Sequence, residues 1–110
     1  MTINSKQKGA RGEREWAQFL NDNGFGKNKP AHRGQQYNGI EGDDVVCDDL
    51  PAIHFEVKRV NALRLEDAVK QSIRDADDKT PVVAYRRDRG EWLVIMRAKD
   101  WCDMVREGMA

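Results

Sequence analysis

Residues 42–58 read GDDVVCDDLPAIHFEVK, two short apolar runs separated by a turn. Each run has the length and the β-branched or aromatic residues that are typical of a strand. Successive side chains of a strand point to opposite faces of a sheet, so Glu56 and Lys58 share one face with His54, while Phe55 points to the other. We therefore expect one face to pack against the core and the other to carry polar chemistry.

Asp44 and Glu56 lie twelve positions apart, a spacing that two short antiparallel strands joined through residues 47–51 would close into a neighbouring pair. Two carboxylates so close repel each other unless a cation lies between them. Oxygen ligands with open coordination positions suit Mg²⁺ or Mn²⁺ better than Zn²⁺. Lys58 projects beside the same place, where its ammonium would orient a water or stabilise negative charge on a phosphate. The alternative is a solvated strand face, because 35% of the chain is charged.

Glu13 is a candidate third carboxylate, in a segment with helical periodicity. Trp16, Ala17 and Leu20 follow it by three, four and seven positions, which places them on the same helix face as Glu13. A carboxylate at the end of an apolar stripe needs a partner such as a metal or a lysine. A glutamate in the first turn of a helix is also favoured by the helix dipole, so the sequence leaves both roles open.

Three motifs in this order resemble the PD-(D/E)XK nuclease superfamily, and within it the archaeal-type Holliday junction resolvases and their small phage-encoded relatives. The motifs are KGARGERE at residues 8–15, DVV at 44–46 and EVK at 56–58. The similarity continues through a predicted helix and two apolar strands to residue 96, so it covers most of the chain.

The resemblance implies a divalent-metal site and a catalytic lysine. The cation would be Mg²⁺, with Mn²⁺ as a substitute, and Lys58 would be the catalytic lysine. Gln71 matches a helix glutamine that supports the site in some branches of the superfamily. The metal-binding positions that the resemblance implies are Glu13, Asp44, Glu56 and Val57.

One position departs from the family pattern. Where the family has Pro-Asp, this chain has Asp43-Asp44, so the motif alone does not say which aspartate is the ligand. Asp44 directly precedes Val45 and Val46, as the family aspartate precedes its apolar pair, and an apolar pair sets the register of a strand. We therefore expect Asp44 to be the ligand and Asp43 to face away or to act from outside the inner ligand set.

The function implied by the resemblance is a metal-dependent DNA endonuclease that hydrolyses phosphodiester bonds. Its substrate would be branched DNA such as a four-way junction, which a homodimer with two active sites would resolve. One alternative is a phage nicking or duplex-cutting endonuclease. Another is a DNA-binding accessory protein without catalysis, in which the acidic cluster is structural.

The formal net charge is zero, which alone does not favour a nucleic-acid partner. The charges are unevenly distributed, because residues 1–33 contain seven basic and three acidic residues, whereas residues 41–50 contain five acidic residues and no basic one. A basic rim around an acidic pocket is what a metal-dependent phosphodiesterase requires, although some of these lysines fit an ordinary solvated surface. The candidate DNA contacts are Lys8, Arg11, Arg33, Arg86 and Arg87.

Length and composition favour a single domain over residues 1–110. A chain of 12.6 kDa has room for one core, and no stretch is long and apolar enough to span a membrane. The amino terminus is polar and lacks the apolar run of a secretory signal, so we expect a cytoplasmic protein of a bacterial or archaeal host cell, in some cases encoded by a phage.

The pattern along the chain predicts an α/β fold with a restriction-endonuclease-like core, a mixed central sheet flanked by helices in the order α-β-β-β-α-β-β-α. Residues 31–42 read as a polar loop near the predicted site. Residues 92–96 form a continuous apolar run, so we expect helices or a second subunit to cover both faces of that strand. The predicted helices cover residues 8–23, 65–77 and 98–107, and the later strands cover residues 82–86 and 91–96.

Overall fold

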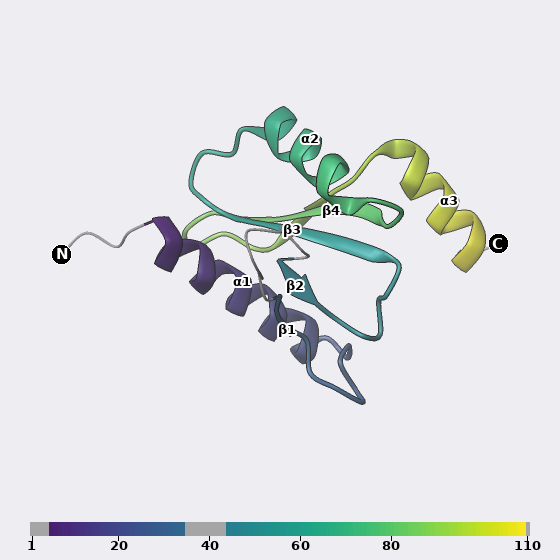
Figure 1. The fold of residues 1–110 in the computed structure, drawn as a ribbon, viewed down its shortest axis with the longest axis horizontal. Coiled ribbons are helices and arrows are strands. Elements are labelled where there is room, and N and C mark those ends of the chain that lie inside the picture. The colour runs from purple at the N-terminus through teal and green to yellow at the C-terminus, as the bar shows by residue number, and fades with distance from the viewer. Residues whose placement is uncertain (1–4, 35–43, 110) are drawn as a thin grey trace.

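The computed structural model describes residues 5–34 and 44–109 of the chain. Figure 1 shows a central sheet with helices on both sides. The element order α-β-β-β-α-β-β-α is the predicted one. The elements are α1 (Ser5–Asp22), β1 (His32–Arg33), β2 (Val45–Val46), β3 (Ile53–Arg59), α2 (Leu65–Ala76), β4 (Thr80–Arg86), β5 (Leu93–Ile95) and α3 (Ala98–Met109).

The five strands form one mixed sheet in the order β1-β2-β3-β4-β5. β3 and β4 are parallel along their whole length, and the other neighbouring pairs are antiparallel. Parallel strands need a crossover connection, which α2 supplies between β3 and β4. α1 and α2 cover opposite faces of the sheet (Figure 1). The predicted α/β architecture with a mixed sheet is therefore confirmed.

The main core lies between α1 and the sheet. Trp16, Ala17 and Leu20 are all buried, as the helical periodicity predicted. The Trp16 ring meets the Phe55 ring edge-on with 5.4 Å between centroids, and its centroid lies 5.1 Å from that of Trp92. Aromatic contacts of this kind join α1 to β3 and to the residue just before β5, which are distant in sequence. They fix α1, and with it Glu13, against the sheet.

The opposite face of β3 is covered by α2. The helix buries the small residues Ala68, Ser72 and Ala76, which allow it to lie close to the sheet. His54 and Glu56 are only 1% and 3% exposed. This face of β3 therefore packs as well, because a helix with small inward residues covers it, and its role in chemistry stays a prediction.

The carboxy-terminal part differs from the prediction for residues 92–96. Trp92 and Met96 pack against the core, but Leu93 and Val94 are 48% and 58% exposed. β5 is an edge strand of the sheet, and α3 extends away from the sheet instead of folding back over it (Figure 1). Within the described residues, helices therefore do not cover both faces of this strand.

Two further expectations can be compared with the structure. The predicted polar loop begins as the short strand β1, and residues 35–42 lie outside the described part of the chain. Among the helices that the structure describes, none combines the length and the apolar character needed to cross a membrane.

Gly12 lets α1 approach β3 closely. A Cβ added at Gly12 would lie 2.5 Å from Arg59 Cβ, an atom close to the backbone that has little freedom to move. Gly12→Ala should therefore destabilise the fold by about 1–3 kcal/mol through overpacking. Gly9→Ala is the matched control on the same helix, because nothing lies within 4 Å of its added Cβ. Gly9→Ala should be neutral or stabilising, because alanine favours a helix more than glycine does. Urea unfolding measures the stability of both variants. Equal stability of Gly12→Ala and Gly9→Ala would contradict the close approach of α1 to β3.

Candidate active site

Asp44 is held at the start of β2 by contacts with both neighbouring strands. Its main-chain N–H donates to the carbonyl of Phe55 at 3.3 Å, and its carbonyl accepts from the N–H of Gly34 at 2.9 Å. The side-chain Oδ2 accepts from the N–H of Val57 at 2.9 Å. The predicted antiparallel register, with Val45 opposite Phe55, is therefore observed, and it brings the Asp44 carboxylate against β3.

Glu56 lies beside Asp44 and is nearly fully buried. Burial raises its pKa to about 9, with further contributions from a hydrogen bond to Asp44 and from the charge of Asp44, whereas Lys58 lowers it. Glu56 Oε1 is buried and has no hydrogen-bond partner among the described residues. Two adjacent carboxyls with an unused buried oxygen fit a divalent cation, which would take the place of the shared proton.

Glu13 approaches the same place from α1. Burial and the nearby charge of Asp44 raise its pKa, and Arg33 lowers it. The Nε of Arg33 lies 3.4 Å from Glu13 Oε2. The charge of Asp44 thus raises the pKa of both Glu13 and Glu56. The three are not gathered into one cluster, since no group of three or more His, Cys, Asp or Glu residues in the described ranges is arranged to hold a metal ion.

The structure brings Lys58 and Gln71 together. Lys58 Nζ donates to Gln71 Oε1 at 2.8 Å, linking the end of β3 to the middle of α2. An ammonium has three N–H donors, so this bond orients Lys58 and leaves donors for a substrate. The two residues that were singled out separately in the sequence therefore form one unit beside Glu56.

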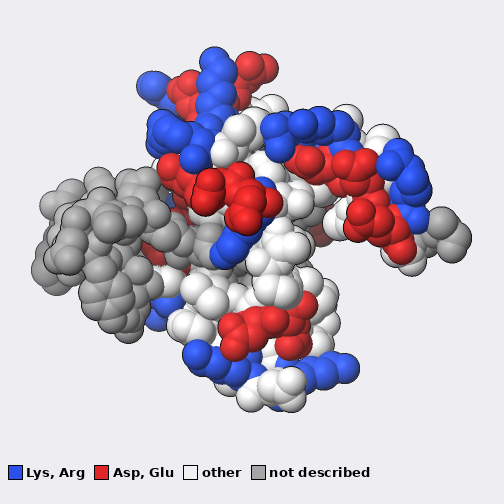
Figure 2. All heavy atoms as spheres, turned by 45° about the vertical axis from the view of Figure 1, so that its right-hand side comes forward, with Lys and Arg blue, Asp and Glu red and all other residues white. Residues whose placement is uncertain are grey.

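The basic residues selected as DNA contacts lie in different environments. Lys8 and Arg11 belong to α1, and the Arg11 side chain is exposed. Arg33 is paired with Glu13, and its side chain is 43% exposed. On the face shown in Figure 2, basic and acidic side chains are interspersed instead of forming one broad basic surface. DNA contact by these residues stays a prediction.

Arg86 and Arg87 differ although they are adjacent in sequence. Arg86 Nε donates to the carbonyl of Gly90 at 2.7 Å, and Arg86 NH1 donates to Glu15 at 3.3 Å. Arg87 is exposed. The guanidinium of Arg86 is therefore engaged inside the protein, and Arg87 is the better placed of the two to reach a ligand.

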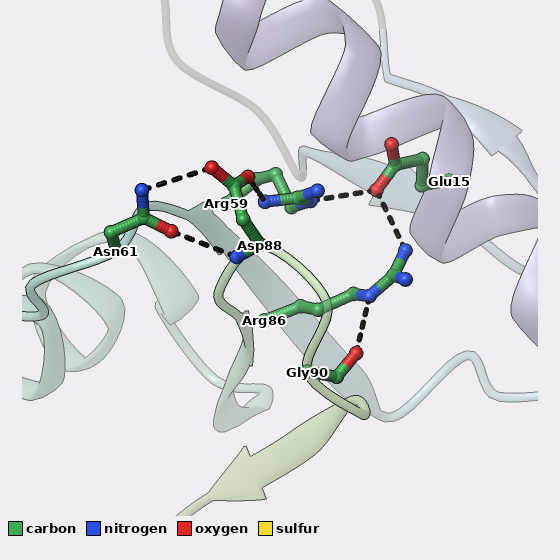
Figure 3. A network of polar contacts seen from close by, with 6 residues as sticks. All are labelled: Glu15, Arg59, Asn61, Arg86, Asp88 and Gly90. Carbon is green, nitrogen blue, oxygen red and sulfur yellow. Dashed lines mark hydrogen bonds and ion pairs between the residues drawn. The ribbon is translucent and has the colours of Figure 1, made fainter.

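Sequence reasoning did not find the polar network to which Arg86 belongs. Its residues come from α1, the end of β3 and the turn between β4 and β5 (Figure 3). Residues in direct contact are separated by up to 71 positions, so no local spacing could have indicated their contact. We call this set the Asp88 network, and its members are Glu15, Arg59, Asn61, Arg86, Asp88 and Gly90.

Comparison with protein families identifies the chain. The family model described as "Phage putative PDDEXK endonuclease" matches residues 4–109. The chain belongs to this family. No curated protein and no solved structure matches it.

Membership of this family implies that the chain is a nuclease and that its substrate class is DNA. The match supports the broader part of the resemblance drawn from residues 8–15, 44–46 and 56–58. It does not extend to the archaeal-type Holliday junction resolvases, for which the comparisons give no support. Of the functions considered from the sequence, the phage endonuclease that was the alternative now has the stronger support.

The pKa of Glu56 predicts how stability depends on pH. The folded state keeps this proton up to about pH 9, whereas the unfolded chain releases it near pH 4.5, the ordinary pKa of a glutamate. The folded state therefore holds the extra proton between these values, and the stability of the metal-free protein falls as pH rises, by up to about 1.4 kcal/mol per pH unit. Glu56→Gln should remove this dependence and be more stable than wild type at about pH 8.

Urea unfolding across this pH range, in the presence of a chelator, measures the effect. Glu91→Gln is the control, because Glu91 is exposed and lies outside the carboxylate pair. Parallel pH profiles for wild type and Glu56→Gln would contradict the raised pKa.

Proposed function

We propose that this phage-family endonuclease hydrolyses DNA phosphodiester bonds with a divalent cation held by Asp44 and Glu56. The observation that carries the proposal is the carboxyl pair of half-buried Asp44 and buried Glu56, in which Glu56 Oε1 has no hydrogen-bond partner among the described residues. Mg²⁺ is commonly bound in proteins by one or two carboxylates together with substrate phosphates and water, so two ligands are sufficient. Mn²⁺ would substitute because it also accepts oxygen ligands.

The residues around the pair have separate roles in this proposal. A bound cation would polarise the phosphate and promote attack by water. Asp44 and Glu56 would bind the cation, and the main-chain N–H of Val57 keeps the Asp44 carboxylate in place. The Glu13 carboxylate on α1 adds negative charge near Asp44. Lys58, oriented by Gln71, donates hydrogen bonds to the phosphate oxygens as negative charge develops on them.

The preferred substrate in this proposal is duplex DNA, cut in one strand or in both, as for the phage endonuclease that the family match favours. A four-way junction is the second candidate. Symmetric cutting of a junction requires two active sites and hence a dimer. The exposed apolar residues of β5 and α3 offer a surface through which two copies could associate, and this supports the junction as a candidate.

Cleavage of labelled DNA tests the catalytic proposal. Wild type should cut in Mg²⁺ or Mn²⁺ and lose activity in EDTA. Lys58→Ala should lower the rate by about 10²- to 10⁴-fold and Glu56→Gln by at least as much, since each removes a group that acts on the transition state. The controls are Lys99→Ala and Glu91→Gln, two exposed residues outside the site.

Comparing linear duplex, nicked duplex, single strand and four-way junction separates the candidates. Equal cutting of linear DNA supports a general endonuclease, and paired symmetric nicks in the junction alone support a resolvase. Tight binding without metal-dependent cutting of any substrate would sink the catalytic proposal and leave the DNA-binding accessory protein.

We also propose that the active form is a homodimer assembled through β5 and α3. Among the strands of residues 5–34 and 44–109, β5 lies at the edge of the sheet, and an edge strand favours pairing with another strand. Leu93 and Val94 on this strand are exposed, as are Trp101 and Met104 on α3. Exposed apolar residues grouped on neighbouring elements are typical of an association surface.

Sedimentation or light scattering tests the dimer with a matched pair of variants. Leu93 on β5 and Leu65 on α2 are both 48% exposed. Leu93→Lys should shift the protein from dimer to monomer, because a buried unpaired ammonium is costly at an interface. Leu65→Lys should leave the dimer intact. A wild-type protein that stays monomeric at high concentration would contradict the proposal.

A further inference from the structure

The turn between β4 and β5 has a conformation that its sequence does not favour. The N–H of Gly90 donates to the carbonyl of Arg87 at 3.0 Å, which closes a four-residue turn. Arg89, the third residue of this turn, has a φ of 61°. Glycine or asparagine is normally found at such a position, because other side chains are strained there. Strained residues persist where surrounding contacts fix them, and they gather at functional sites.

Asp88 supplies the contacts that fix the turn. Its N–H donates to Asn61 Oδ1 at 2.8 Å, and its Oδ2 accepts from Asn61 Nδ2 at 2.9 Å. Its Oδ1 accepts from Arg59 NH1 at 2.7 Å. Figure 3 shows Asp88 between the two partners, both of which come from the end of β3 and the segment after it. The turn is therefore docked against the strand end that carries Lys58.

The same contacts continue to α1. Arg59 Nε donates to Glu15 Oε2 at 2.9 Å, and this oxygen also accepts from Arg86 NH1 at 3.3 Å. Arg59 directly follows Lys58, and Glu15 lies on the helix that carries Glu13. The Asp88 network thus joins the turn to β3 and α1, two of the elements that supply the candidate site.

The charges within the network balance. Glu15 and Asp88 offset Arg59 and Arg86, whose side chains are 15% and 31% exposed. Arg87 and Arg89, by contrast, are exposed on the turn itself. The network is therefore close to neutral inside, while the turn that it holds presents two guanidinium groups to the solvent.

We propose that the Asp88 network is a positioning device that holds Arg87 and Arg89 beside the catalytic end of β3 to bind the phosphates of the DNA strand. Asp88 is the positioning residue. Arg89 contacts a phosphate, and this contact explains why an arginine occupies a position with positive φ. Fixed cations bind an anion with less loss of conformational entropy than mobile ones. The inference rests on the proposed function in that it requires DNA to be the ligand.

The sign of the change in DNA affinity on removing Asp88 tests the positioning role. Asp88→Ala deletes a negative charge at the DNA-facing turn, which by simple electrostatics would tighten DNA binding. Positioning predicts the opposite, an affinity about fivefold or more weaker, because the turn is released. Asp103→Ala on α3 is a matched control, since Asp103 and Asp88 are 61% and 62% exposed and each pairs with an arginine. It should change affinity by less than about twofold.

A substitution at Arg89 provides a second test, because it should keep or raise the stability of the fold while it lowers the affinity for DNA. Arg89→Gly relieves the positive φ, so the thermal midpoint should be kept or raised. DNA affinity should nevertheless fall, and the slope of log affinity against log salt should decrease by about one phosphate contact. Arg89→Lys keeps the charge and should restore most of the affinity.

The measurement is fluorescence anisotropy of a labelled linear duplex in EDTA over a series of KCl concentrations, with thermal unfolding of each variant recorded alongside. Weaker binding by Asp88→Ala and Arg89→Gly, with Asp103→Ala unchanged, supports the inference. Wild-type affinity or tighter binding in both variants would overturn it while leaving the endonuclease proposal standing. Absence of DNA binding by the wild type would also overturn the inference, whereas the endonuclease proposal is decided separately by cleavage in Mg²⁺ or Mn²⁺.

Discussion

The site depends on one costly arrangement, the buried Glu56 of β3 lying beside the half-buried carboxylate of Asp44. Like charges in a poorly hydrated place are unfavourable, and without a cation the pair is kept by holding a proton, as the pKa of about 9 for Glu56 indicates. The fold tolerates this because the surrounding groups are fixed. Val57 donates to Asp44, and α2 closes over Glu56 with small residues. The stability of the metal-free protein is therefore coupled to the chemistry of the site.

Much of the fold could be predicted from local pattern. The alternation of residues 53–58 placed Glu56 and Lys58 on one face, and the apolar pair after Asp44 set the register that brings it to β3. The periodicity after Glu13 gave the buried face of α1. Each of these signals lies within a few residues of the feature that it predicts, and strand or helix geometry converts it directly into a position in space.

The predictions failed, or were silent, where long-range contacts decide the outcome. Burial of His54 and Glu56 depends on which helix covers the sheet, and exposure of Leu93 and Val94 depends on α3 extending away. The contact of Lys58 with Gln71 was not predicted, although each residue had been singled out as a candidate. The Asp88 network left no trace in the sequence, because isolated charged residues carry no periodic signal.

The arginines illustrate why counting charges misleads in a chain of zero net charge. Arg33, Arg59 and Arg86 have acidic partners within the protein, so their charge is largely balanced before any ligand arrives. Two of them, Arg59 and Arg86, share the carboxylate of Glu15 on α1. The contact of Gly12 with Arg59 lies on the same part of the helix, one residue before Glu13. α1 is thus held to the end of β3 on both sides of Glu13, while the Glu13 carboxylate itself is engaged by Arg33, from β1. The position of α1 is set by its packing at Gly12 and by the charge-balanced contacts of Glu15. Glu13, which lies near Asp44, is paired instead with the partly exposed Arg33.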